Sequence, residues 1–133
     1  MGPRMDTNGH EKEILERELV YSVVGCALEV LRTLGHGMSE KPYENALVTE
    51  FRLRAIAFEQ QPRYNVMYKS VCVGEFVPDL VVERRLIVDA KVVETIGDRE
   101  YGQMLNYLRI AGLRVGLLLN FHQPKLEWKR VVL

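Results

Sequence analysis

The sequence contains little cysteine, no excess of either charge and no long apolar run. Its two cysteines, Cys26 and Cys72, stand in apolar surroundings without metal-ligand spacing, so we expect reduced structural thiols and neither a disulfide framework nor a zinc site. Eighteen basic and eighteen acidic residues cancel, which excludes a global field that would draw nucleic acid to the whole surface. No apolar run could span a bilayer and no signal-peptide pattern is present, so we expect a cytoplasmic protein with no membrane partner.

The length and composition are typical of a small globular protein. The 133 residues, 47% hydrophobic and 27% charged, suffice for one compact domain with a real core and not for two. We expect residues 1–10 to be a disordered start, with Gly2-Pro3-Arg4 typical of an expression-tag scar. Residues 11–133 are then expected to form the single domain.

Helical and strand patterns follow one another along the chain. Apolar residues recur at three- and four-residue steps from about Glu11 to Leu34, and Ser39 can cap a second helix that runs to about Arg54. A third helical stretch covers 99–111. Shorter apolar runs predict strands, one of them within 56–68 and the others at 71–77, 80–92, 115–121 and 127–133. This order predicts an α/β fold, with helices flanking a central mixed β-sheet.

The stretch around 80–88 reads as a hairpin with carboxylates at its open end. Two apolar runs, Leu80–Val82 and Leu86–Val88, flank the polar residues Glu83-Arg84-Arg85. A two-residue turn of Arg84-Arg85 would need positive φ at both positions, which arginine accepts poorly, so a three-residue loop is expected. That register places Asp79 directly opposite Asp89, and cross-strand neighbours point to the same face.

A lysine joins the two carboxylates on that face. Strand alternation places Lys91 on the same side as Asp89 and turns Ala90 the other way. Like charges paired across strands repel each other, so the arrangement predicts a cation between the carboxylates. Hard oxygen ligands favour Mg²⁺ or Mn²⁺.

The second predicted helix carries two glutamates on its core-facing stripe. Glu40 and Glu44 share this stripe with Leu47 and Phe51, because steps of four, three and four residues stay on one side of a helix. Glu40 is explained equally well as a first-turn acid favoured by the helix dipole and as a site residue. Glu44 lies a turn further in, where an unpaired charge would be expensive, so it ranks higher as a third acid.

Pro78-Asp79, nine intervening residues and then Asp89-Ala90-Lys91 resemble the signature of the PD-(D/E)XK nuclease superfamily. The segment 37–43, Gly-Met-Ser-Glu-Lys-Pro-Tyr, resembles the GxxExxY motif of a bacterial family within that superfamily. Gln103 and Tyr107 fit the QxxxY motif of several of its nuclease branches. Order and spacing agree from Gly35 to Val131, so the resemblance implies a restriction-endonuclease-like core.

The resemblance implies roles for individual residues. Asp79, Asp89 and the backbone carbonyl of Ala90 would bind one or two Mg²⁺ or Mn²⁺ ions, with Glu44 completing the site and Glu40 as a further candidate ligand. Lys91 would position the attacking water or steady the charge on the phosphate. By analogy with relatives, Gln103 would hold the water or a phosphate and Tyr107 would support it; a polar helix boundary with an amphipathic tyrosine explains this pair equally well.

These features lead to two functional hypotheses. The first is a metal-dependent nuclease that hydrolyses phosphodiester bonds, more readily assigned to DNA than to RNA, and acting as a homodimer because cutting both strands of a duplex requires two sites. The second keeps the fold without turnover, as a nuclease-like module for nucleic-acid binding or protein assembly.

Overall fold

The computed structural model describes residues 16–133. The expected disordered start at 1–10, and the beginning of the first helix at 11–15, lie outside the described residues. In chain order the elements are α2 (Arg17–Leu34), α3 (Glu40–Leu53), β1 (Phe58–Gln60), β2 (Tyr64–Tyr68), β3 (Val71–Phe76), β4 (Leu80–Val82), β5 (Leu86–Lys91), α4 (Asp98–Ala111), β6 (Val115–Asn120) and β7 (Glu127–Val132). Within residues 16–133, no helix is both long enough and apolar enough to cross a membrane.

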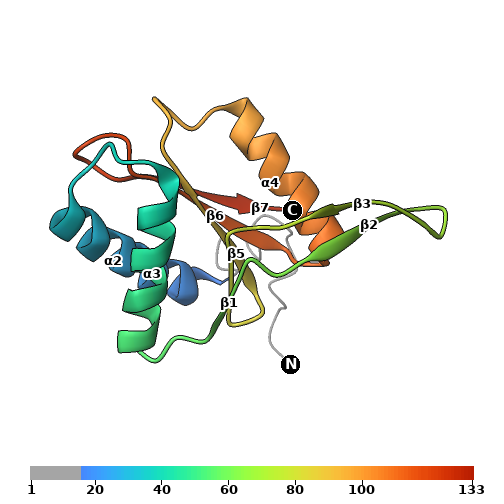
Figure 1. Cartoon of the computed structure of the whole chain (residues 1–133), viewed down its shortest axis with the longest axis horizontal. Helices are drawn as coiled ribbons and strands as arrows, with labels where there is room; N and C mark the ends of the chain where they lie inside the picture. The colour runs from blue at the N-terminus through green and yellow to red at the C-terminus, as the bar shows by residue number, and fades with distance from the viewer. Residues whose placement is uncertain (1–15) are drawn as a thin grey trace, which may run out of the picture.

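Five strands form a mixed sheet in the order β1-β4-β5-β6-β7 (Figure 1). The β5–β6 pair is parallel, and the other neighbours are antiparallel. A parallel pair needs a long crossover, which α4 supplies between β5 and β6. The fold is therefore the predicted restriction-endonuclease-like α/β arrangement, with β5 at the centre of the sheet.

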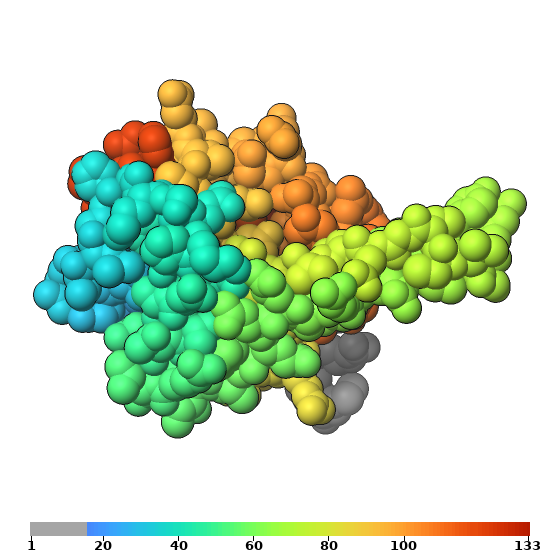
Figure 2. All heavy atoms as spheres, in the orientation of Figure 1, coloured from blue at the N-terminus to red at the C-terminus, as the bar shows by residue number. Residues whose placement is uncertain are grey.

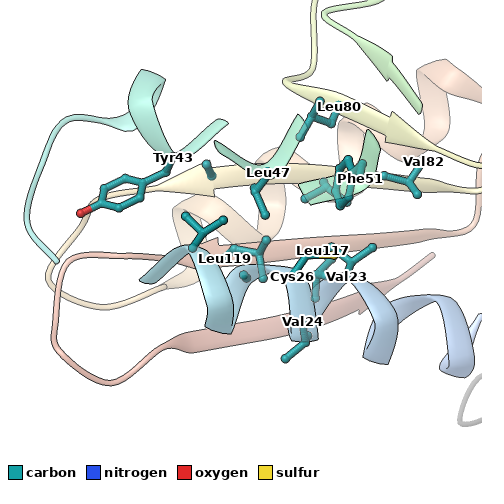
Figure 3. Packing of buried hydrophobic residues seen from close by; sticks show 14 of the residues in the cluster. Val23, Val24, Cys26, Tyr43, Leu47, Phe51, Leu80, Val82, Leu117 and Leu119 are labelled. Atoms are coloured by element: carbon teal, nitrogen blue, oxygen red, sulfur yellow. The ribbon is translucent and has the colours of Figure 1, made fainter. Parts of the chain in front are cut away.

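Helices α2 and α3 cover one face of the sheet (Figures 1 and 3). Alternate residues of β5, namely Leu86, Val88 and Ala90, belong to the core cluster on this face, as Leu80 and Val82 of β4 do. The helices contribute fully buried side chains that include Val23, Cys26, Leu47 and Phe51. The predicted amphipathic stripes are confirmed over most of their length, and burial of these apolar faces holds the helices to the sheet. Their ends are corrected, because Leu34 and Glu40 are exposed.

Helix α4 covers the opposite face. Ile87 of β5 and Leu118 of β6 pack there with Met104 and Leu108 of the helix. Gly116 of β6 makes the close approach possible, since a Cβ atom at this position would overlap the side chain of Met104. Residues of odd number on β5 therefore point toward α4, and this alternation decides the face on which Asp89 and Lys91 lie.

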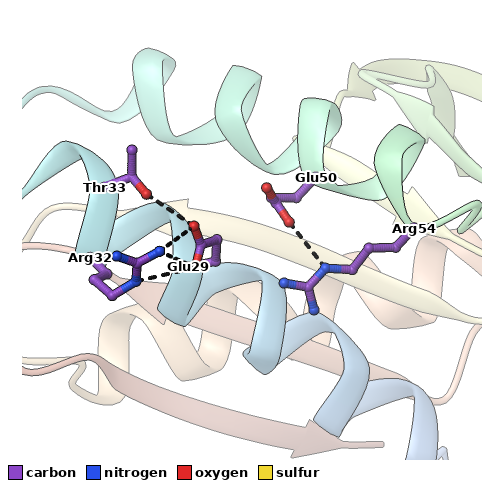
Figure 4. A network of polar contacts seen from close by, with 5 residues as sticks. All are labelled: Glu29, Arg32, Thr33, Glu50 and Arg54. Carbon is purple, nitrogen blue, oxygen red and sulfur yellow. Dashed lines mark hydrogen bonds and ion pairs between the residues drawn. The ribbon is translucent and has the colours of Figure 1, made fainter.

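Polar side chains of α2 and α3 pair with near neighbours in the chain. Glu29 accepts hydrogen bonds from Arg32 and Thr33, and Glu50 accepts one from Arg54 (Figure 4). Solvent screens exposed pairs of this kind, so they contribute little to stability. The covered apolar faces, and not these pairs, stabilise the layer.

Strands β2 and β3 form a second, two-stranded sheet that projects from the body (Figures 1 and 2). We call residues 64–76 the arm. The strand predicted within 56–68 is in fact two strands, β1 and β2, in different sheets, because 61–63 breaks the pairing after Gln60. Cys72 lies in the arm and is exposed, which corrects the expectation of apolar surroundings; Cys26 is buried as expected.

Candidate functional site

The hairpin of β4 and β5 has the predicted register. Leu80 pairs with Val88, and residues 83–85 form the three-residue connection. The connection does not avoid positive φ, since φ is 53° at Glu83 and 58° at Arg84. Glu83 is also bonded to the neighbouring segment, because its N–H donates to the carbonyl of Ala57 and its carboxylate accepts from the N–H of Ala57. These bonds offset the local backbone strain.

Asp79 and Asp89 lie side by side at the open end of this hairpin. The backbone N–H of Asp79 donates to Oδ1 of Asp89 at 3.2 Å, and the backbone N–H of Ala90 donates to Oδ2 of Asp79 at 2.9 Å. Each carboxylate is thus held by the backbone of the opposite strand. Because the N–H and C=O of one strand residue point to the same edge, the carbonyl of Ala90 also points toward Asp79.

Burial raises the pKa of both carboxyl groups. The pKa of Asp79 rises to about 7, first through burial, then through the charge of Asp89, with smaller contributions from Glu44 and Glu40. The Asp89 pKa is also raised by burial, against the opposing effects of Lys91 and of the Asp79 N–H. The structure therefore brings carboxyl groups together where solvent screens their charges poorly. A cation bound there would reduce the repulsion between them.

Lys91 continues β5 on the same face. Its Nζ lies 3.9 Å from Oδ2 of Asp89 and donates to Oε1 of Gln103 at 3.0 Å. Gln103 projects from α4, so the helix that covers this face also orients the ammonium group. The Lys91 side chain is only 17% exposed, which strengthens its attraction to Asp89 relative to a surface pair.

Tyr107 lies one turn after Gln103 on α4 and contacts the arm. Its ring stacks on Phe76 of β3 with 4.4 Å between centroids, and Phe76 stacks in turn on Tyr64. The Tyr107 pKa is raised by burial and by the charges of Asp89 and Asp79. The QxxxY pair thus contacts two different parts of the molecule, Gln103 the lysine and Tyr107 the base of the arm.

Glu44 is buried, with 3% of its surface exposed, and three side chains donate to it. Lys41 donates to Oε1 at 3.1 Å, while Gln60 and Gln61 donate to Oε2 at 2.6 and 3.3 Å. The two glutamines are not among the site residues predicted from the sequence. No periodic or spacing signal marks them, because their role depends on a helix that lies elsewhere in the chain.

Glu40 lies at the exposed start of α3. Its Oε2 accepts the backbone N–H of Val92, just beyond β5, at 3.2 Å. It therefore fixes the end of the central strand, and its charge contributes to the raised pKa values of both aspartates. Glu40 is the more peripheral of the two glutamates.

The remaining residues of the GxxExxY pattern build the turn between α2 and α3. Tyr43 is fully buried, stacks on Phe121 at 4.4 Å, and donates its hydroxyl proton to the carbonyl of Gly35 at 2.6 Å. Gly37 has φ of 85°, which favours glycine. Tyr43 therefore packs and hydrogen-bonds locally, and it holds the turn that precedes α3.

The donor set suits a hard divalent cation. Asp79 and Asp89 offer carboxylate oxygens on one face, Ala90 offers a carbonyl on the same edge, and the local charge is negative in excess of the one lysine. Across residues 16–133, however, no three His, Cys, Asp or Glu side chains are gathered closely enough to hold a metal ion together. The fit thus rests on two carboxylates, with the glutamates of α3 nearby.

The comparisons with known proteins agree with this geometry. The family model described as the PD-(D/E)XK nuclease superfamily matches residues 17–131, which is most of the chain. No curated protein and no solved structure gives a significant match. The superfamily suggests metal-dependent nuclease chemistry, usually with divalent ions, and a nucleic-acid substrate. On this match, the chain belongs to the PD-(D/E)XK nuclease superfamily.

Proposed function

We propose that the protein is a Mg²⁺- or Mn²⁺-dependent nuclease that hydrolyses phosphodiester bonds in DNA. The observation that carries the proposal is the pair of carboxylates formed by half-buried Asp79 and buried Asp89, bonded across β4 and β5 beside the ammonium of Lys91. The GxxExxY pattern at 37–43 supports placement in that bacterial family. We further propose that residues 11–133 act as one cytoplasmic domain and that two copies associate to cut both strands.

In this proposal Asp79, Asp89 and the carbonyl of Ala90 hold one or two ions, with Glu44 completing the set and Glu40 at its edge. The ion supplies Lewis-acid stabilisation for the charge that builds on the phosphate and makes water more acidic. Lys91 stands where it can orient the attacking water or neutralise the phosphate oxygens. Gln103 orients Lys91, and Tyr107, which stacks on Phe76, lies near enough to feel the charges of both aspartates.

Cleavage of labelled DNA tests the proposal directly. We expect activity that requires Mg²⁺ or Mn²⁺ and that falls by at least about 100-fold in both site variants, because Asp79→Ala removes a ligand of the ion and Lys91→Ala removes the positive charge that faces the reacting phosphate. Lys125→Ala, at an exposed lysine in the loop after β6, is the matched control and should retain full activity. Equal activity in wild type and both site variants would refute the assignment. Labelled RNA in parallel decides the substrate class.

A binding or assembly module without turnover is the second candidate. It is favoured by the close pairing of Glu44 with three donors and by the lack, within residues 16–133, of a three-carboxylate metal group. Calorimetric titration with Mn²⁺ separates the two functions. A nuclease site should bind the ion and lose that affinity in Asp89→Ala, whereas absence of binding in the wild type would favour the module.

A further inference from the structure

Glu44 is held by amide groups that come from another part of the chain. Gln60, the last residue of β1, donates through Nε2 to Oε2 of Glu44 at 2.6 Å and to Oδ1 of Asn45 at 3.0 Å. The next residue, Gln61, donates to the same oxygen of Glu44 at 3.3 Å. Two neutral donors therefore bind one oxygen of Glu44. The residue is only 3% exposed, and a carboxylate buried to this extent needs hydrogen-bond partners from the protein.

Gln61 also contacts the strand that carries the first aspartate. Its backbone N–H donates to the carbonyl of Asp79 at 2.8 Å. Its φ of 51° lies in the left-handed region that few glutamines occupy. This conformation lets one residue bond to Asp79 through its backbone and to Glu44 through its side chain. Gln61 thus links α3 directly to the start of β4.

The chemistry of the donors distinguishes them from Lys41. An amide holds a carboxylate without cancelling its charge, so Glu44 keeps its attraction for a cation. Lys41, whose side chain is 56% exposed, pairs with the other oxygen of Glu44, where solvent screening weakens the pair. A carboxylate offers about four lone-pair positions and three donors take three of them, so one position on Oε1 remains.

We infer that Gln60 and Gln61 are positioning residues that fix Glu44 relative to Asp79, so that the Glu44 carboxylate acts, directly or through water, on a cation held by the two aspartates. The inference rests on the proposed function, since it gives the pair a role toward the same ion. It goes beyond the need to satisfy a buried carboxylate, because it requires the glutamines to change the affinity for the cation. Residues that orient ligands typically alter metal affinity about 10- to 100-fold when removed.

Four variants and a control test this role. Gln60→Met keeps the length and apolar packing of the side chain and removes the amide. Gln61→Asn keeps a residue that tolerates positive φ, shortens the reach to Glu44 and leaves the backbone bond to Asp79 intact. Glu44→Gln removes the charge, and Glu44→Gln combined with Gln60→Met closes a double-mutant cycle. Gln123→Ala, at an exposed glutamine in the loop after β6, is the matched control.

The primary measurement is Mn²⁺ affinity by calorimetry, with thermal unfolding in EDTA to show that each variant folds. We expect Gln60→Met and Gln61→Asn each to weaken Mn²⁺ binding by about 10-fold and Gln123→Ala to leave it unchanged. In the Glu44→Gln background, Gln60→Met should cause no further loss, because the amide acts only through that carboxylate. Wild-type affinity in both glutamine variants, or an equal loss with and without the Glu44 charge, overturns the inference alone. A wild type that binds no Mn²⁺ overturns the proposed function and this role with it.

Discussion

The aspartate pair of the main sheet and the arm lie close together in the chain. They differ in what they bury and what they expose to solvent. Asp89 is 5% exposed and is held by a backbone N–H, whereas Tyr68 and Val71 at the far end of the arm are each 60% exposed. The first region buries charge at the centre of the fold, and the second displays apolar side chains outside it. The comparison teaches that neither polarity nor hydrophobicity alone decides burial in this protein; the register of β4 and β5 and the projection of β2 and β3 do.

The energetic consequences differ accordingly. A buried carboxylate costs free energy until a proton or a cation neutralises it, so the aspartates make stability depend on pH and on metal. Apolar side chains that remain in solvent contribute little to folding, because they lose little contact with water. The junction between the two regions is aromatic, where Phe76 of the arm stacks between Tyr64 and Tyr107.

Breaking that junction should have the largest effect on stability. Phe76→Ala removes a ring that stacks at 5.2 Å on Tyr64 and at 4.4 Å on Tyr107, and we expect a loss of about 3 kcal/mol in the free energy of unfolding. Urea denaturation measures the loss, and hydrogen exchange should show weaker protection in the arm. Val73→Ala, at a side chain that is 59% exposed, is the control and should change stability far less. Equal effects of the two changes would show that the arm is not anchored by its aromatic base.

The buried carboxylates should make metal-free stability fall as pH rises. The Asp79 pKa of about 7 in the fold exceeds the ordinary value of 3.8, so the folded state binds more protons between these values and loses stability as pH rises through this window. The full shift would correspond to about 4 kcal/mol, and partial solvent access reduces the expected change to about 2 kcal/mol. Asp79→Asn keeps the acceptor for Ala90 and removes the titration.

Urea denaturation in EDTA at several pH values from 4 to 8 checks this expectation. The wild type should lose stability across the window more steeply than Asp79→Asn, and the variant should be the more stable protein at pH 8. Parallel slopes for the two proteins would contradict the burial of charge at this position. Added Mn²⁺ should reverse the order at pH 8, because only the wild type retains both carboxylates for the ion.

The features that could be predicted from the sequence depend on patterns within short segments. The hairpin register was predictable because apolar runs on both sides of Glu83-Arg84-Arg85 allow few pairings, and Glu44 was predictable as a buried acid from its place on a helical stripe. The placement of Asp79 beside Asp89 follows from local periodicity plus one turn. The proposed roles of these residues remain predictions that the experiments above decide.

What could not be predicted depends on contacts between distant segments. The pattern from 56 to 68 predicts one strand, and the choice of partner, β4 for β1 and β3 for β2, places two strands there in different sheets. The contacts of Gln60 and Gln61 with Glu44 need the packing of α3 against the end of β1, to which no periodicity refers. The exposure of Cys72 has the same origin. Its neighbours in the sequence are apolar, but they form the projecting arm and do not cover the cysteine.

The smallest expected effect lies at the outer end of the arm. Met67 and Tyr68 are 56% and 60% exposed, so replacing both with serine should change the free energy of unfolding by no more than about 0.5 kcal/mol. Urea denaturation of the double variant, with wild type and Phe76→Ala measured alongside, ranks the tip against the base. A loss that approaches the effect of Phe76→Ala would mean that these side chains are covered in solution. Since the chain described here leaves them exposed, the covering surface would have to belong to a second molecule, and the loss would then depend on protein concentration.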